Sequence, residues 1–445
     1  MSRVWSAAAG QGLAIAAKGA PEAIAELCRL SPDDRKEIAA RASDMASEGL
    51  RVLGVAKSKW GQSPLPESQQ ELTFELIGLV GLADPIRPEV PAAVEECHRA
   101  GIRVIMITGD YPGTAQNIAK QVGISTPDQV LTGVEVGRMN DSELKERVGS
   151  TNVFARMVPE QKLRLVNALK ANGEVVAMTG DGVNDAPALK AAQIGIAMGG
   201  RGTDLARESA DLVLLDDSFS SIVEAIRQGR RIFGNLRKAM SFVFAVHVPI
   251  VGLALIPVLA RWPLVLMPVH IVFLELIIDP ACSIAFEAEP EEPGSMQRAP
   301  RKAGEPLLSR RRIVMSVLQG LSVLLVVFLV FMSARYRGES ETTARTLAFT
   351  ILVIGNLMLI LTNRSWTRSI VATLRIPNRS LWWVVLGAVA LPVLVIYVPF
   401  LQTLFRFSPL HLPDIAVCPA GGITSLLWFE GWKLLRNKVG GAKSA

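Results

Sequence analysis

The stretch Thr179-Gly-Asp-Gly-Val-Asn-Asp-Ala-Pro187 follows directly on the apolar run Val175–Met178. A short apolar run bounded by turn residues is typical of a buried strand, and the glycines after it begin a polar loop. Asp181, Asn184 and Asp185 place three oxygen-bearing side chains on this loop, and such ligands suit Mg²⁺ beside a phosphate. The stretch therefore predicts a phosphate and magnesium site at the carboxyl end of a strand.

Outward from this loop, short apolar runs alternate with amphipathic stretches. We expect strands at Leu76–Leu82, Arg103–Thr108, Asn152–Ala155, Val175–Thr179, Ile194–Ala197 and Leu212–Leu215, and helices at Glu89–Ala100, Gly113–Val122, Pro159–Ala171 and Ala186–Ala192. Alternating strands and helices favour parallel strands with crossover helices, so the expected fold class is α/β, doubly wound. Residues 1–60 differ, with a helical pattern near Ser31–Glu48 and a strand at Arg51–Ala56, and indicate another small domain.

A second expected strand ends in the same tripeptide, Thr108-Gly109-Asp110. Thr108 can offer a hydroxyl and a backbone N–H to a phosphoryl oxygen. Lys162 begins a helix between the two strands and can bring a positive charge to the same oxygens. We therefore expect Thr108 and Lys162 to face the phosphoryl group bound by the 179–187 loop.

The apolar content lies mostly in residues 240–435, although the whole 445-residue chain is 50% hydrophobic and only 20% charged. A membrane-spanning helix needs about 20 apolar residues. Six stretches qualify, at residues 242–260, 264–286, 313–334, 346–362, 381–403 and 414–434. The pattern predicts an all-α membrane domain of six transmembrane helices, and it excludes disorder, a coiled coil and a fully soluble enzyme.

The basic residues beside these stretches predict the orientation of the chain. The loops after the second and fourth stretches and the tail are rich in them: Arg298, Arg301, Lys302, Arg310, Arg311, Arg312, Arg364, Arg368, Arg375, Arg379, Lys433, Arg436, Lys438 and Lys443. Basic loops stay in the cytoplasm, so we expect an integral protein of the plasma or inner membrane with its N-terminal half and C-terminus cytoplasmic. The net charge of +6 arises largely from these residues, so the expected partner is the lipid bilayer and not a nucleic acid.

Glu275 and Asp279 stand four residues apart in the second apolar stretch and share one helix face. An ionisable residue in mid-membrane costs roughly 2.5–3.5 kcal/mol, which favours a functional role. Two carboxylates one turn apart suit a hard divalent cation or a proton relay. His247 is a further candidate, as an ion ligand, a proton carrier or a histidine hydrogen-bonded between helices, whereas Glu287 fits a carboxylate at the interface.

The Thr179–Pro187 stretch resembles the hinge motif of P-type cation-transporting ATPases, within the haloacid-dehalogenase superfamily. Other pieces follow in the order of that family: Lys18-Gly-Ala-Pro-Glu22, Asp84-Pro-Ile-Arg87, Thr108-Gly-Asp110, and Phe154-Ala-Arg156 with Pro159–Lys162. The resemblance runs from about residue 14 to the last apolar stretch, and the six expected spans match the last six of ten. It implies ATP and Mg²⁺ as cofactors and a cation as the transported species.

The resemblance also implies roles for individual residues. Asp181 and Asp185 would hold Mg²⁺; Thr108, Gly109, Lys162 and Asn184 would bind the phosphoryl group; Lys18, Arg51, Asp84, Arg87 and Asp110 would face ATP. For the transported ion, Asp279 matches the family, Glu275 is a substitution, and His247, Ile250 and Asn356 stand where the calcium pump has asparagine, glutamate and glutamate. Calcium is the first expectation, and manganese, magnesium or a proton-coupled monovalent ion remain open.

The sequence departs from the family by lacking both an Asp-Lys-Thr motif, which carries the phosphorylated aspartate, and the Thr-Gly-Glu actuator loop. Without the nucleophile, covalent phosphoryl transfer cannot start. We therefore expect the C-terminal portion of a pump, inactive alone, with a separate N-terminal half as a candidate partner. Its expected domains are the remainder of a nucleotide-binding domain (1–72), a phosphorylation-type domain without its nucleophile strand (73–238) and the membrane domain (239–445). The alternatives are a non-catalytic, pump-derived membrane subunit and a membrane-anchored phosphatase, though the latter would need its own nucleophilic aspartate.

Overall fold

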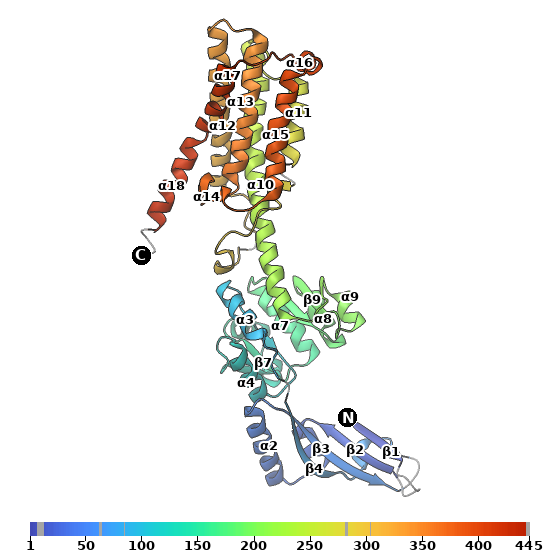
Figure 1. Cartoon of the computed structure of the whole chain (residues 1–445). Coiled ribbons are helices and arrows are strands. Elements are labelled where there is room, and N and C mark those ends of the chain that lie inside the picture. Colours follow the sequence, from blue (N-terminus) through green and yellow to red (C-terminus); the bar gives the residue numbers. More distant parts are fainter. Residues whose placement is uncertain (7–12, 62–64, 84, 281–283, 303, 442–445) are drawn as a thin grey trace. The chain divides into compact units, whose positions relative to one another are not determined.

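The computed structural model of the 445-residue chain describes all residues except 7–12, 62–64, 84, 281–283, 303 and 442–445. The chain forms two compact units (Figure 1). The first comprises Met1–Ile226 with Met296–Ala303, and the second comprises Arg227–Ser295 with Gly304–Ala445.

The first unit begins with an antiparallel four-stranded sheet. Its strands lie in the order β1 (Ser2–Ser6), β2 (Leu13–Gly19), β3 (Arg51–Trp60) and β4 (Glu75–Leu82), and its helices are α1 (Pro21–Leu27) and α2 (Pro32–Ser47). The Ser31 side chain accepts the N–H of Asp34 and so caps α2. The strand expected at 76–82 forms as β4, but it pairs antiparallel with β3 and belongs to this sheet, not to a parallel one.

The rest of the first unit is an α/β fold with two groups of three parallel strands. The strands are β5 (Met106–Ile107), β7 (Val153–Ala155) and β6 (Val130–Thr132) in one group, and β10 (Leu212–Leu214), β9 (Ile194–Met198) and β8 (Ala177–Gly180) in the other. The helices are α3 (Val90–Arg99), α4 (Pro112–Val122), α5 (Gly133–Arg138), α6 (Asp141–Val148), α7 (Pro159–Ala171), α8 (Ala186–Ala191) and α9 (Asp204–Ser209). Parallel strands with intervening helices confirm the expected α/β class.

Four elements of this fold were not predicted: β6, α5, α6 and α9 (Asp204–Ser209). Strand β6 has three residues, too few to show a hydrophobic period. Helices α5 and α6 are also short, but each begins with a capping box, Thr132 with Glu135 and Asn140 with Glu143. The hydroxyl and N–H of Thr132 lower the pKa of Glu135 by hydrogen bonding to its carboxylate. The Thr-x-x-Glu and Asn-x-x-Glu spacings were the signals that could have located both helices.

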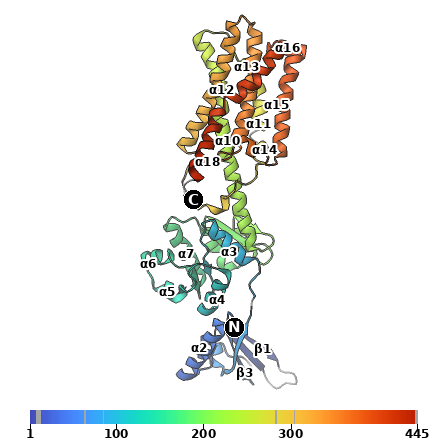
Figure 2. The ribbon, with the colours of Figure 1, turned by 60° about the vertical axis from the view of Figure 1, so that its left-hand side comes forward.

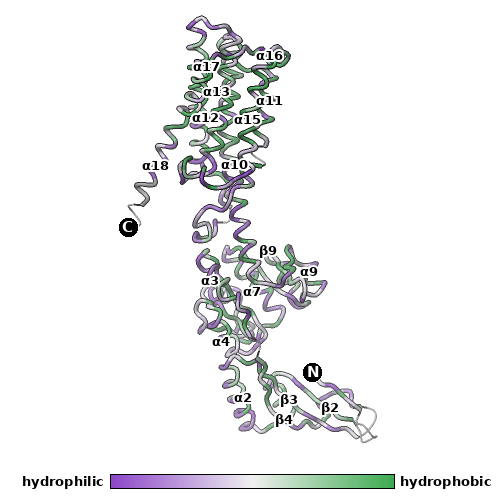
Figure 3. Tube along the Cα trace, in the orientation of Figure 1, coloured by the Kyte–Doolittle hydropathy of each residue, from purple (hydrophilic) through white to green (hydrophobic). Residues whose placement is uncertain are grey.

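The second unit is all-α. Its helices are α10 (Phe219–Ala260, whose first residues belong to the first unit), α11 (Pro268–Pro280), α12 (Arg310–Tyr336), α13 (Glu341–Asn363), α14 (Ile370–Leu374), α15 (Arg379–Tyr397), α16 (Pro399–Phe405), α17 (Leu412–Thr424) and α18 (Leu427–Gly441). Helix α13 packs against α12, α15 and α17 and is the most buried of the long helices (Figure 2). Hydrophobic residues dominate most of these helices, whereas α18 and the first part of α10 carry many hydrophilic ones, as Figure 3 shows.

Over the residues that the structure describes, five helices are long and apolar enough to cross a membrane, where six were expected. The expected span 264–286 contains α11, which has 13 residues and rises about 20 Å, against about 30 Å of hydrocarbon. The helix starts late because Pro268 fits its first turn, and residues 281–283 of that span lie outside the described ones. The expected span 381–403 is also divided, because Val398 is extended before Pro399 and separates α15 from α16.

Candidate functional site

The loop Thr108–Asp110 follows β5 directly and forms a tight turn. The Thr108 hydroxyl donates to Oδ2 of Asp110 at 2.9 Å and accepts the N–H of Asp110 at 3.1 Å. The N–H of Thr108 donates to the carbonyl of Phe154 on β7 at 2.9 Å. The expectation that this backbone N–H faces a phosphoryl oxygen is therefore wrong, whereas the expectation for the Thr108 hydroxyl stays a prediction. Strand pairing continues through Thr108 and takes up this N–H. Gly109, which is exposed and has open space around its Cα, is the remaining backbone position at the turn.

The loop Thr179–Pro187 starts at the end of β8 and leads into α8. Ile107, the last residue of β5, packs against the same hydrophobic cluster as Met178 on β8. Thr108 and Thr179, which follow these two residues, therefore leave neighbouring strand ends. This is the arrangement that the repeated Thr-Gly-Asp tripeptide predicted.

Gly180 is required for the path of this loop. A Cβ added at Gly180 would lie 2.5 Å from Cβ of Asp185, closer than side-chain atoms approach. Asp185 is therefore folded back over the end of the strand, where it is 7% exposed. One oxygen of its carboxylate accepts the N–H of Gly182 at 3.3 Å.

Lys162 lies in the first turn of α7 and reaches this carboxylate from the neighbouring element. Its Nζ is 2.7 Å from Oδ1 of Asp185, and the two side chains are 18% and 10% exposed. Water and salt screen a pair this well shielded less than they screen a surface ion pair. The structure thus brings Lys162 to the 179–187 loop, as the sequence predicted.

Asp181 and Asn184 are exposed on the same loop. The carbonyl of Asp181 accepts the N–H of Thr203 at 2.9 Å, which fixes the backbone while leaving the carboxylate open to solvent. In the described part of the chain, no group of three or more His, Cys, Asp or Glu side chains is gathered as a metal centre. An open carboxylate, an amide oxygen and a phosphate oxygen together still form the oxygen-rich donor set that Mg²⁺ uses.

Asp110, one of the expected nucleotide-binding residues, lies on the 108–110 loop, which we call the phosphate loop, and Arg51 is another that the structure brings to it. Its Nε lies 3.4 Å from Oδ1 of Asp110. Lys18 is exposed on β2, and Arg87 donates to the carbonyl of Asp217 at 2.5 Å. Asp84, the other residue expected to face ATP, lies outside the described residues.

The sequence motifs assign no role to Arg156 by itself, and the structure gives it two contacts. Its Nη2 lies 3.2 Å from the carboxylate of Glu22, at the start of α1, and its guanidinium stacks 5.2 Å from the Tyr111 ring. The Phe154-Ala-Arg156 motif was the available signal. Arg156 thereby joins the antiparallel sheet's helix to the loop that follows Asp110.

Of the four residues expected on the ion path, the structure brings together His247 of α10 and Glu275 of α11. His247 Nε2 lies 3.9 Å from Oε1 of Glu275, and Nδ1 is 2.9 Å from the carbonyl of Val243. Glu275 also borders a cavity of about 370 Å³, whose other lining residues are Val269, Val272, Phe273, Leu276, Leu404 and Phe405. Asn356 is buried on α13, with no hydrogen-bond partner for either amide atom. The side chain of Asp279 lies outside the described part.

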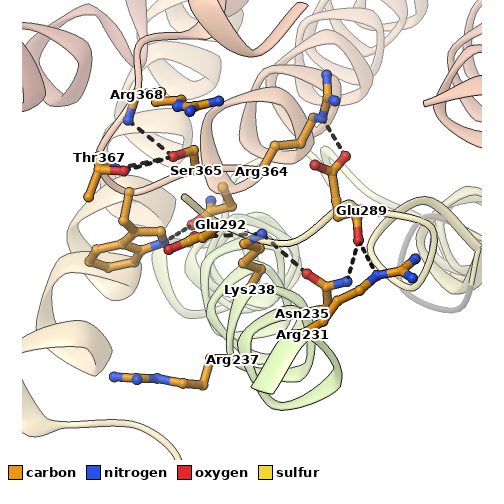
Figure 4. A network of polar contacts seen from close by, with 12 residues as sticks. Arg231, Asn235, Arg237, Lys238, Glu289, Glu292, Arg364, Ser365, Thr367 and Arg368 are labelled. Carbon is orange, nitrogen blue, oxygen red and sulfur yellow. Dashed lines mark hydrogen bonds and ion pairs between the residues drawn. The ribbon is translucent and has the colours of Figure 1, made fainter. Parts of the chain in front are cut away.

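A buried polar network at one end of the second unit was not predicted (Figure 4). Glu289, 3% exposed, accepts from Arg364 Nε at 2.6 Å, as Figure 4 shows. It also accepts from Asn378 Nδ2 at 2.6 Å. Its carbonyl accepts from Arg231 at 2.9 Å and from Asn235 at 2.8 Å. The residues come from segments far apart in the sequence, so no local pattern could have located the network.

Comparisons with known proteins agree with this architecture. Residues 263–435 match the family model described as cation transporting ATPase, C-terminus, and residues 4–193 and 162–226 match models of haloacid dehalogenase-like hydrolases.

Relatives extend the match across most of the chain. It is 36% identical to calcium-transporting ATPase 1 of Bacillus cereus over 86% of this chain and 45% of that protein. It is 37% identical to a cation-transporting ATPase of Synechocystis over 92% of this chain and 47% of that one. It is 37% identical to the calcium-transporting ATPase of Bacillus subtilis over 88% of this chain and 45% of that protein.

The chain thus spans about half the length of the curated relatives that it matches. Its long apolar helices and these matches together identify an integral membrane protein. By its sequence motifs, its α/β and helical units and its relatives, the chain belongs to the family of cation-transporting P-type ATPases.

Proposed function

We propose that this chain supplies the phosphoryl-binding site and the membrane ion path of an ATP-driven cation transporter. The observation that carries the proposal is the Lys162–Asp185 pair, which places a shielded ammonium at the 179–187 loop. The reaction proceeds through an aspartyl phosphate. Because these 445 residues contain no Asp-Lys-Thr motif, the aspartate that receives the phosphoryl group lies outside them, and an N-terminal half of the pump is its proposed source.

At the phosphate site, Lys162 brings positive charge to the phosphoryl oxygens, and the Thr108 hydroxyl and the Gly109 backbone line the neighbouring strand end. Asn184 contributes its amide from the loop opposite. These groups act by position and charge, which is what phosphoryl transfer mainly requires of a protein.

Asp181 and Asp185 are the proposed magnesium carboxylates, and their contacts favour different tasks. Asp181 has its carboxylate open to solvent, which suits a direct ligand. Asp185 is engaged by Lys162 and by the N–H of Gly182, so it positions the lysine and the loop beside the metal. When bound, Mg²⁺ would offset the negative charge of the phosphoryl oxygens.

Lys18, Arg51, Asp84, Arg87 and Asp110 are the proposed nucleotide-facing residues. The Arg51–Asp110 pair supports this proposal, because it connects the antiparallel sheet that carries Lys18 to the phosphate loop. A guanidinium and an ammonium on this side would bind the anionic phosphates of ATP.

For the transported cation we propose Glu275, Asp279, His247 and Asn356 as the ion-path residues, with Ca²⁺ as the first candidate. The approach of His247 to Glu275 and the unpartnered amide of Asn356 support this assignment. Buried polar groups without partners are costly, and an ion is one partner that removes the cost. The basic loops support a cytoplasmic position for the N-terminal half and the C-terminus.

Phosphoenzyme formation tests the proposal. Membranes that contain this chain alone are incubated with labelled ATP, Mg²⁺ and a panel of cations and are quenched with acid. A second sample contains this chain joined to the N-terminal portion of the calcium-transporting ATPase of Bacillus subtilis, with Asp181→Asn in that fusion as the matched variant.

We expect no label on the chain alone and a cation-stimulated, hydroxylamine-sensitive label on the fusion that Asp181→Asn removes. A label on the chain alone would show that another carboxylate receives the phosphoryl group. A folded fusion without any label would overturn the proposal.

A further inference from the structure

Four arginines gather where three helices of the second unit meet, and we call them the arginine cluster: Arg237 on α10, Arg311 and Arg312 at the start of α12, and Arg436 on α18. In the described part of the chain, no hydrogen bond or ion pair engages any of their guanidinium groups, and the Nε of Arg237 is buried without a partner. Arg231 and Arg364, which lie nearby, are both hydrogen-bonded (Figure 4). In the same view, Arg237 makes no marked contact. The cluster is therefore a set of unused donors.

The charges around Arg312 do not balance. The charged groups acting on Arg312 are Arg237, Arg436 and a single carboxylate, that of Glu292. Glu292 is already 3.6 Å from the ammonium of Lys238. Arg237 and Arg312 are partly buried. Positive charges that outnumber their counter-ions repel one another, and partial burial removes some of their hydration, so the site favours an added anion.

Each of these arginines stacks on an aromatic ring, Arg237 on Phe233 at 5.7 Å and the other three on tryptophans. Arg312 lies 4.6 Å from the ring centre of Trp366, while Arg311 and Arg436 lie 5.6 and 5.4 Å from that of Trp432. Phe429 lies between the two indoles, 5.5 Å from Trp366 and 5.2 Å from Trp432. A guanidinium stacked on a ring keeps its N–H edge free for a planar or tetrahedral anion. Tryptophan is also the residue that favours the membrane–water boundary.

An apolar stripe leads away from the cluster along α12. It consists of exposed side chains three or four residues apart that begin one turn after the arginines: Val314, Leu318, Leu321, Leu325 and Leu329. Residues at this spacing share one helix face. A soluble phosphate compound would need the arginines alone, whereas a lipid would use both the arginines and the stripe.

We propose that the arginine cluster binds the phosphate headgroup of an anionic phospholipid, whose acyl chains lie along the α12 stripe. Arginine forks bind phosphate oxygens in pairs, and basic pockets at the ends of membrane helices are the setting in which lipid headgroups are recognised. The proposal does not depend on the proposed transport function, because it uses none of the phosphate-site or ion-path residues.

Native mass spectrometry of the full chain in detergent tests the proposal. The chain is titrated with phosphatidylglycerol, with phosphatidylcholine and with inorganic phosphate, and retained adducts are counted. The test variant is R311Q/R436Q, and R311K/R436K restores the charge without the planar fork. The matched control is R375Q/R379Q, which removes two exposed arginines just before and at the start of α15; within the described residues, neither side chain makes a hydrogen bond or an ion pair.

We expect one tight phosphatidylglycerol adduct, with at least tenfold weaker binding in R311Q/R436Q, partial recovery in R311K/R436K and no change in R375Q/R379Q. Millimolar inorganic phosphate should not displace the lipid. Equal binding of phosphatidylcholine, or equal loss in the control variant, would overturn the proposal. Displacement by inorganic phosphate would show a phosphate site without lipid specificity and would also overturn it. If R311Q/R436Q does not fold, R436Q alone should show the weakening, because Arg436 is exposed at the end of α18.

Discussion

The ammonium of Lys162 lies 2.7 Å from Oδ1 of Asp185, although 23 residues separate the two in the chain. The pair closes the 179–187 loop against the first turn of α7. It therefore couples the stability of the first unit to the geometry of the phosphate site, and the two effects can be measured separately.

Replacing Lys162 with methionine should lower the stability of the first unit and slow phosphorylation at the phosphate site. Removing the ammonium leaves the shielded Asp185 carboxylate with one hydrogen bond. We therefore expect the free energy of unfolding to fall by about 1–3 kcal/mol. In the fusion with an N-terminal pump portion, loss of the positive charge should reduce the phosphorylation rate by about 10²–10³-fold. Thermal unfolding and phosphoenzyme assays measure the two effects. Lys120→Met, which removes an exposed partner of Asp128, is the control and should change neither appreciably.

Gly180→Ala should destabilise the loop by steric conflict. The added methyl group would lie 2.5 Å from Cβ of Asp185 and would push that residue off its contacts. We expect a loss of about 1–3 kcal/mol, typical of overpacking, read as a lower unfolding midpoint. Gly109→Ala is the matched variant, because a Cβ there meets no atom within 4 Å. Equal midpoints for the two variants would contradict the role given to Gly180.

Breaking the Glu289–Arg364 pair should strongly destabilise the helical unit. Both side chains are nearly inaccessible, at 5% and 2%, and removing one leaves the other charge buried. We expect Arg364→Met to cost about 3–5 kcal/mol. A thiol-reactive dye can follow unfolding through the buried Cys418. Glu37→Gln removes an exposed pair with Arg41 and should cost less than about 1 kcal/mol. If Arg364→Met and Glu37→Gln lowered the free energy of unfolding by similar amounts, the Glu289 carboxylate would not be buried.

Acid should loosen the turn at Gly200 and Arg201. The N–H of Gly200, and then the N–H and guanidinium of Arg201, lower the pKa of Asp217 below its ordinary value of 3.8. A carboxyl with a depressed pKa stabilises the fold above its ordinary pKa and loses this effect as the pH falls through the depressed value. Amide exchange at Gly200 and Arg201, corrected for intrinsic rates, should therefore accelerate below about pH 4.

Asp217→Asn should remove this pH dependence and expose both amides at neutral pH. Asp204→Asn, whose carboxylate is paired with Arg207 on the exposed face of α9, should leave the dependence intact. If Asp217→Asn retained the acid-induced acceleration, another group would have to be responsible.

On the ion path, Asp279→Asn in the fusion should abolish cation-stimulated turnover while nucleotide binding persists. A carboxylate within the membrane has a high free-energy cost, and binding of the cation offsets that cost. Turnover against cation concentration and binding of a fluorescent nucleotide are the two measurements. Glu287→Gln is the control, because Glu287 is exposed near the end of the helical region. Unchanged stimulation in Asp279→Asn would place the ion path elsewhere.

Much of the fold could be predicted because its signals are local. Strands β7, β8, β9 and β10 and helices α3, α4, α7 and α8 follow apolar runs, amphipathic periods and turn residues, and the repeated Thr-Gly-Asp predicted adjacent strand ends. The pairing of β4 could not be predicted in this way. Its eight residues suit either an antiparallel or a parallel neighbour, and the choice depends on which strand edge the chain meets.

The membrane helices show a second limit. Hydropathy locates apolar residues but does not show where proline ends a helix, so the division at Val398 and the late start at Pro268 both shortened expected spans. Within the candidate site, residue identities predicted Lys162 near the 179–187 loop, whereas its ion pair with Asp185 and the hydrogen bond that takes up the Thr108 N–H depend on the folded structure. The Glu289 network lay beyond prediction, because it joins residues up to 89 positions apart.

Glu289 has a consequence for how the helical unit opens. Its carboxylate binds the segments that follow α13 and precede α15, while its carbonyl binds α10, so a local fluctuation in one segment must break hydrogen bonds to the other two. Segments tied in this way exchange their amide hydrogens as one cooperative unit. Positions distant in the sequence, near residues 235, 289 and 378, would share one opening free energy, and the helical unit would resist proteases at all three together.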